Sequence, residues 1–74
     1  MSLERVFAEV FAIPEETVND SLALRDISSW DSMSHMMLIA RVEEEFSVEL
    51  TGDEIADFRT VNDVREALDR RGVR

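Results

Sequence analysis

The chain of 74 residues contains no cysteine and no tyrosine, and it has only one proline and two glycines. Without cysteine, neither a disulfide nor a thiolate metal site can stabilise the fold, and no side chain offers a thiol nucleophile. Scarce aromatic residues count against an all-β fold, and scarce helix-breaking residues favour helices. A chain without cysteine is also compatible with the cytoplasm, where we expect this protein to reside.

Long apolar runs and an excess of positive charge are absent as well. No apolar segment reaches the length of a membrane span, and residues 1–5 lack the basic and apolar features of a signal peptide. The formal net charge of −9 argues against nucleic acid as a partner, because contact with phosphates needs a basic surface. It favours partners with basic docking surfaces. Acidity that merely keeps a small protein in solution is the alternative.

The spacing of apolar residues predicts a first helix followed by one long loop. Apolar side chains recur at helical spacing from residue 3 to residue 11, with Ser2 as a candidate N-cap, and Pro14 stops the helix. One helical turn is expected directly after the proline. The segment 14–31 has no sustained period, and we expect a loop anchored by its own apolar side chains, which are Val18, Leu22, Leu24 and Ile27.

Three further helices are expected after this loop. The second runs from about residue 32 to 46 and a short third from 52 to 57, while the last starts after Thr60 and is ended by Gly72. The length suffices for one small core, so we expect residues 1–74 to form a single, monomeric domain. The predicted fold is all-α, a small antiparallel bundle of three main helices plus one short helix. Its expected core consists of Val6, Phe7, Val10, Phe11, Leu38, Val42, Phe46, Val61, Val64 and Leu68.

The second helix has two apolar faces, whereas a surface helix needs only one to pack on its core. At about 100° per residue, the face that matches the core contains Leu38, Ile39, Val42 and Phe46. The opposite face contains Met33, Met36 and Met37, and methionine recurs on surfaces that accept several partners. We therefore predict a docking surface there, with Glu43 and Glu44 as an acidic rim. The alternative is that the long loop covers the methionines.

The residues around the start of this helix resemble those of a known family. The segment 30–33 reads Trp-Asp-Ser-Met, and the helix ends Val-Glu-Glu-Glu-Phe at 42–46. This pattern resembles the Asp-Ser-Leu attachment site of acyl carrier proteins, followed by their acidic second helix. The resemblance covers nearly the whole chain, because the amphipathic first helix, the long loop and the Thr60-Val61 pair fall in family order.

The resemblance implies that Ser32 carries 4′-phosphopantetheine, donated by coenzyme A, and that the thiol of this arm carries acyl groups as thioesters. A separate phosphopantetheinyl transferase would supply the base, and Asp31 would contact that enzyme. The chemistry is compatible, since the start of a helix stabilises a phosphate anion. On local chemistry alone, capping of the helix is the favoured role for Ser32, and it is the alternative role for Asp31.

Several residues depart from the commonest pattern of that family. Met33 stands where leucine is usual, and Trp30 replaces a small residue. Ser34 and Met37 occupy positions where fatty-acid carriers often have acidic residues. These departures favour a specialised pathway over housekeeping fatty-acid synthesis. The expected partners are the transferase and acyl-activating or acyl-transferring enzymes with basic or apolar docking surfaces.

Two other functions are weaker interpretations of the same residues. Ser32 and His35 are helical neighbours, but a hydrolase would also need an oxyanion hole and a cleft, so we expect no catalysis. We expect no metal site either, because no calcium-binding loop appears. The main alternative is a non-covalent helical interaction module that uses Met33, Met36 and Met37 without a cofactor. Side chains that would line an acyl pocket, or simply the core, are Leu38, Val42, Phe46, Ile55, Phe58 and Val61.

Overall fold

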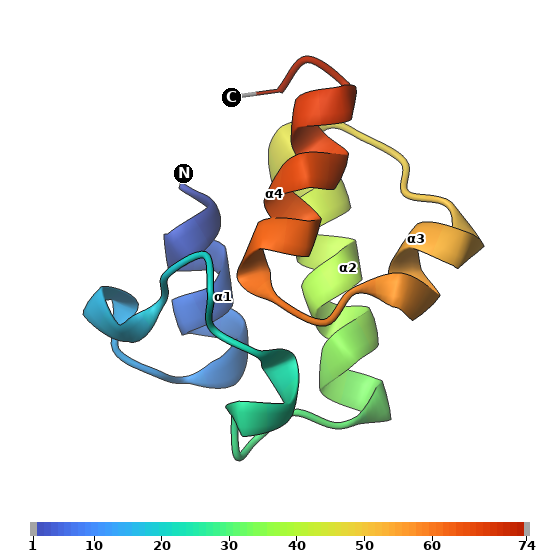
Figure 1. The fold of residues 1–74 in the computed structure, drawn as a ribbon. Coiled ribbons are helices and arrows are strands. Elements are labelled where there is room, and N and C mark those ends of the chain that lie inside the picture. Colours follow the sequence, from blue (N-terminus) through green and yellow to red (C-terminus); the bar gives the residue numbers. More distant parts are fainter. Residues whose placement is uncertain (1, 74) are drawn as a thin grey trace.

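A computed structural model describes residues 2–73 and confirms the all-α fold. The helices are α1 (Leu3–Phe11), α2 (Ser32–Phe46), α3 (Gly52–Asp57) and α4 (Val61–Arg70). Figure 1 shows α1, α2 and α4 as the body of a bundle, with short α3 on the side away from α1. The expected antiparallel packing is confirmed for α1, which runs opposite to α2 and α4. The last two run in the same direction, because the segment that contains α3 leads the chain back.

Local capping residues explain where the helices begin. The side chains of Ser2, Asp31, Thr51 and Thr60 each accept a hydrogen bond from a backbone N–H of the following first turn, which satisfies a donor that the helix leaves unpaired. The prediction that Pro14 stops the first helix needs a correction. The helix ends at Phe11 and its C-cap is Ala12, in the left-handed conformation with φ of 55°, so the chain has already turned before the proline.

The core lies where α1, α2 and α4 meet, and it is closed by the long first loop. Most of the expected core residues are buried, with Val6, Phe7 and Leu38 fully inaccessible. Val10 and Phe46 are corrections, because both are only partly buried and pack on the edge of the core. Further buried side chains come from outside the periodic segments, and these are Val18, Leu24, Ile27, Leu50 and Phe58.

The loop between α1 and α2 is ordered both by local turns and by hydrogen bonds to a distant segment. Two short 3₁₀ turns, Glu15–Thr17 and Leu24–Asp26, give it local structure, and the first confirms the turn expected after Pro14. The Leu24 N–H then donates to the Arg59 carbonyl at 2.9 Å, within an isolated antiparallel bridge between Ala23 and Thr60. This bridge joins the loop to the segment before α4, so the chain that leads into α2 is held against the rest of the fold.

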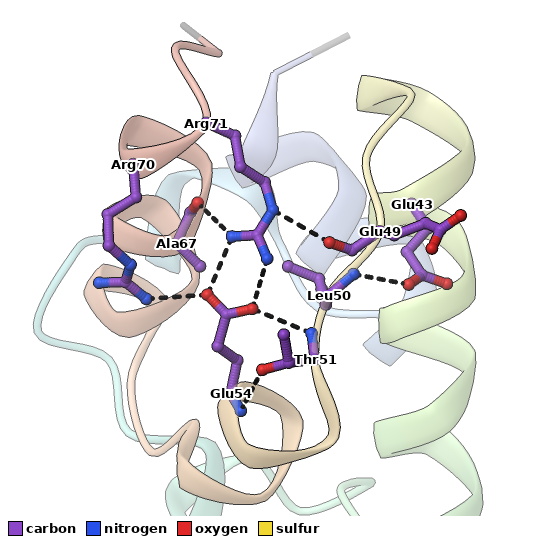
Figure 2. A network of polar contacts seen from close by, with 8 residues as sticks. All are labelled: Glu43, Glu49, Leu50, Thr51, Glu54, Ala67, Arg70 and Arg71. Carbon is purple, nitrogen blue, oxygen red and sulfur yellow. Dashed lines mark hydrogen bonds and ion pairs between the residues drawn. The ribbon is translucent and has the colours of Figure 1, made fainter.

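A polar network centred on Glu54 connects α3 with the end of α4 (Figure 2). The Glu54 carboxylate accepts hydrogen bonds from Arg71 at 2.9 Å and Arg70 at 3.1 Å, and from the Thr51 backbone N–H at 2.9 Å. Arg71 also donates to the carbonyl of Ala67 at 2.8 Å. The Arg71 guanidinium, followed by the Thr51 N–H, holds the pKa of Glu54 well below its usual range. Arg70 and Arg71, at the end of α4, thus hold α3 in place.

Candidate functional site

The start of α2 is built by a reciprocal pair of hydrogen bonds. Asp31 accepts from the Ser34 N–H at 2.8 Å, and the Ser34 hydroxyl oxygen accepts from the Asp31 N–H at 2.8 Å. The Ser34 N–H, with the Ser34 hydroxyl next, lowers the pKa of Asp31, because these bonds favour the ionised carboxylate. Asp31 is therefore the N-cap that local chemistry suggested, and Ser32 is not.

Ser32 is the first residue of α2 and its side chain is exposed. Among residues 2–73, no hydrogen bond engages its hydroxyl. The residue opens into a groove of about 600 Å³ that runs between the start of α2 and α3. An anion attached there would lie near the positive end of the α2 dipole. The groove is lined by Trp30, Asp31, Ser32, His35, Met36, Gly52, Ile55, Ala56, Phe58 and Arg59.

A short chain of hydrogen bonds crosses this Ser32 groove. The Trp30 indole N–H donates to His35 Nδ1 at 3.1 Å, and His35 Nε2 lies 2.9 Å from the Ile55 carbonyl oxygen of α3. Since Nδ1 accepts from the indole, the proton of the neutral ring is on Nε2 and donates to that carbonyl. His35 is thus a partly buried polar residue, and it links the loop, α2 and α3 at the site.

The opposite faces of α2 differ sharply in exposure. Met33 is 75% exposed, Met36 54% and Met37 53%, whereas Leu38 and Val42 are fully buried. The alternative in which the long loop covers these methionines is therefore wrong. We call Met33, Met36 and Met37 the methionine face. It begins directly beside Ser32 and presents flexible apolar side chains to the solvent, as a surface that accepts other proteins would.

The two acidic residues expected at the rim of this face lie in different surroundings. Glu44 is exposed. Glu43 is partly buried, and its carboxylate accepts the Leu50 backbone N–H at 2.9 Å (Figure 2). Glu43 therefore supports the connection between α2 and α3 from within the chain, a contact that no local pattern indicates because its partner lies in a loop. A rim role for either residue stays a prediction.

The groups considered for metal or acyl binding occupy defined places. Within residues 2–73, no cluster of three or more histidine or acidic side chains could hold a metal ion. No helix in that range combines the length and apolar character needed to cross a membrane. Of the side chains considered for an acyl pocket, Leu38, Val42 and Val61 are fully buried and Phe58 is 5% exposed, while Phe46 and Ile55 pack partly buried against them. They form part of the core in this structure.

Sequence reasoning missed the contribution of two residues to the groove. Trp30 was noted as an unusual residue, but its bond to His35 depends on how the loop meets α2. Arg59 comes from the segment after α3 and lines the groove beside Phe58. Because both contacts cross between elements distant along the chain, periodicity could not reveal them. A Trp and a His five residues apart around a helix start are the only local signal.

Comparisons with known proteins agree with this geometry. A family model described as "Phosphopantetheine attachment site" matches residues 2–68. A curated protein named "Acyl carrier protein", from Acidothermus cellulolyticus, is 31% identical over 61 residues, which are 82% of this chain and 73% of the relative.

Two solved structures share the fold. A holo acyl carrier protein from Geobacter metallireducens superposes with a TM-score of 0.82 at 28% identity, covering 92% of this chain and 78% of that one. A putative acyl carrier protein from Mycobacterium tuberculosis superposes with a TM-score of 0.81 at 19% identity, covering 95% and 99%. At that lower identity the second likeness concerns the fold alone.

Proposed function

The chain belongs to the acyl carrier protein family, whose phosphopantetheine attachment model matches it from residue 2 to 68, and we propose that Ser32 bears the arm. The observation that carries this proposal is the placement of Ser32. Its hydroxyl is exposed at the first residue of α2 and opens into a groove, while the neighbouring Asp31 takes over the capping of the helix. The serine is therefore free to be modified without loss of a structural contact.

The chain's own residues position the arm but do not catalyse its attachment or the transfer of acyl groups. A serine hydroxyl needs an activating base to act as a nucleophile, and both nitrogens of His35, the single histidine, are engaged by Trp30 and Ile55. A separate phosphopantetheinyl transferase therefore supplies the base. In this proposal the protein is a carrier without catalysis of its own, and its contribution is the effective concentration of the tethered acyl group.

The methionine face and the acidic surface select the enzymes that exchange acyl groups with the arm. Methionine side chains adapt to different apolar surfaces, and the net charge of −9 attracts partners with basic docking surfaces. Met37 and Ser34 replace the acidic residues common in fatty-acid carriers, so apolar contact near Ser32 carries more of the recognition. These features support a role in a specialised pathway. In this proposal, residues 1–74 form a single monomeric domain that acts in the cytoplasm.

The test is intact-protein mass spectrometry after incubation with coenzyme A and a broad-specificity phosphopantetheinyl transferase. We expect the wild type to gain one phosphopantetheinyl group and Ser32→Ala to gain none while its circular dichroism stays helical. Ser28→Ala, which changes an exposed serine in the preceding loop, is the matched control and should load fully. A folded wild type that gains no mass beside a working control carrier would favour the non-covalent module built on the methionine face.

A further inference from the structure

The arginines of this acidic chain are paired with carboxylates in most places. Arg5 and Arg41 pair with Glu9. Arg65 pairs with Glu4 and Asp20, and both Arg70 and Arg71 pair with Glu54.

Two arginines in the described part of the chain differ from these, because their guanidinium groups are not paired with a carboxylate. Neither Arg25 nor Arg59 forms an ion pair with any residue from 2 to 73, although the chain has 17 acidic side chains against 8 basic ones. Both are exposed. Two unpaired guanidinium groups in so acidic a protein are unexpected on charge alone, since opposite charges are available almost everywhere on its surface.

Arg25 and Arg59 line the same cavity. It has a volume of about 220 Å³, and no carboxylate contributes to its lining, which consists of Ala23, Leu24, Arg25, Trp30, Phe58, Arg59 and Thr60. The bridge between Ala23 and Thr60, with the 2.9 Å bond from the Leu24 N–H to the Arg59 carbonyl, joins its two walls. The lining therefore combines apolar residues, two arginines and two backbone segments that the bridge holds together.

This arginine cavity adjoins the Ser32 groove. Trp30, Phe58 and Arg59 line both hollows, whereas Ser32 lines only the groove and Arg25 only the cavity. A phosphate attached to Ser32 would lie at the groove end of these two adjoining hollows. An arm that folds back along the shared residues Trp30, Phe58 and Arg59 would bring its distal end to the cavity. An anion at the end of the cargo would thus meet the two guanidinium groups, which bind carboxylates with paired N–H donors.

We infer that the arginine cavity binds a carboxylate at the far end of the acyl cargo, so that the carrier retains dicarboxylic acyl groups better than neutral ones. The inference rests on the proposed attachment at Ser32. Charge complementarity supports it, because a second carboxylate is repelled by the acidic surface and attracted only where the lining is cationic. The apolar walls of Leu24 and Phe58 contact the methylene carbons between the thioester and the carboxylate.

The experiment compares two arms that differ only in the terminal group. Apo protein is loaded by the transferase with coenzyme A analogues whose terminal amide carries a succinyl or a butyryl group, and loading is verified by intact mass. Proton–nitrogen NMR spectra then report on residues 23–25, residues 58–60 and the arginine Nε–H groups. We expect the succinyl arm to shift the signals of Arg25 and Arg59, the butyryl arm to leave them at the holo positions, and salt to diminish the difference.

Two variants separate the arginine cavity from general electrostatics. The double variant Arg25→Gln, Arg59→Gln, once its loading has been verified by intact mass, should lose the succinyl-dependent shifts at 23–25 and 58–60. Arg5→Gln, which changes an exposed arginine of α1 that pairs with Glu9, should keep them.

Other outcomes would overturn the inference. Identical spectra for both loaded forms would refute it while leaving the attachment intact. Arginine shifts already complete in the holo protein would assign the cavity to the phosphate instead. Failure to gain mass at all would overturn both proposals.

Discussion

The two faces of α2 belong to one helix but serve opposite purposes. On the inner face, Leu38 and Val42 are fully buried against the core. On the methionine face, side chains of similar volume remain more than half exposed beside Ser32. Burial of an apolar side chain stabilises the fold by roughly 1.5–3 kcal/mol, and the methionine face forgoes that gain within this chain. The comparison teaches that the apolar character of the methionine face does not serve the core, which is what a docking surface of the proposed carrier requires.

Charged groups show the same division. Glu54 accepts several hydrogen bonds inside the fold and contributes to the position of α3. The guanidinium groups of Arg25 and Arg59, beside the site, form no ion pair with a carboxylate among residues 2–73. The charged groups around Glu54 are thus satisfied by one another, whereas these two guanidinium groups remain available for the interaction proposed above.

The largest expected effect comes from matched truncations on the two faces. Leu38→Ala should destabilise the domain by about 2–5 kcal/mol, since it removes fully buried carbon atoms and leaves a cavity. Met37→Ala should change the stability by less than about 0.5 kcal/mol, as is usual for an exposed position. Urea unfolding followed by circular dichroism measures both. Equal losses in the two variants would contradict the division between the faces.

The second-largest effect comes from comparing a carboxylate that accepts hydrogen bonds within the fold with one that is exposed on α2. Glu54→Gln should destabilise the domain by about 1 kcal/mol at neutral pH, because charge-assisted bonds weaken and exposure discounts the ion pairs. Glu44→Gln, at an exposed position of α2, is the matched control and should have little effect. Thermal unfolding at pH 7 is sufficient to compare them.

The pH dependence of Glu54→Gln sharpens this test. The pKa of Glu54 is lowered in the folded state from its ordinary value of 4.5. Its stabilising contribution is therefore complete above that value and is lost as the pH falls toward the lowered folded pKa. The difference in free energy of unfolding between wild type and variant should stay constant from pH 7 to about pH 5. It should disappear in more acidic solution. A gap that persisted unchanged at pH 2 would mean that packing, not charge, is responsible.

The smallest effect on stability, and the most specific one on function, is expected for Met37→Glu. The side chain is 53% exposed, so unfolding should be almost unchanged and Ser32 should still be modified. Acyl transfer from a native partner enzyme should become slower or be redirected, because apolar contact is replaced by charge. Steady-state kinetics against carrier concentration measure this, with Ser28→Ala, which lies outside the methionine face and its predicted rim, as the comparison. Unaltered kinetics with every native partner would remove the methionine face from recognition.

Local patterns explain why much of this fold could be predicted from the sequence. The range of α2 follows from its N-cap, Asp31, and from the helical spacing of its apolar residues. The start of α3 follows from its N-cap, Thr51. Such caps can be recognised locally because the side chain bonds to a backbone N–H only three residues further on. The link between Ala23 and Thr60 and the bonds around Glu54 could not be predicted in this way. Their partners are distant along the chain, and only the packed structure brings them together. The same reason hid the Arg25 and Arg59 cavity.

The hydrogen bonds of His35 also bear on the lifetime of the cargo. A thioester is an activated acyl group, and it is lost when a nearby amine, thiol or imidazole attacks it or activates water. The chain has no cysteine, its eight basic residues are all arginine, and the lone pair of His35 Nδ1 is occupied by the Trp30 indole N–H. Around Ser32 the described part of the protein thus offers no amine, no thiol and no free imidazole nitrogen to attack such a group. If Ser32 carries the arm as proposed, the surface beside the cargo does not promote its loss, and release is left to the enzymes that receive it.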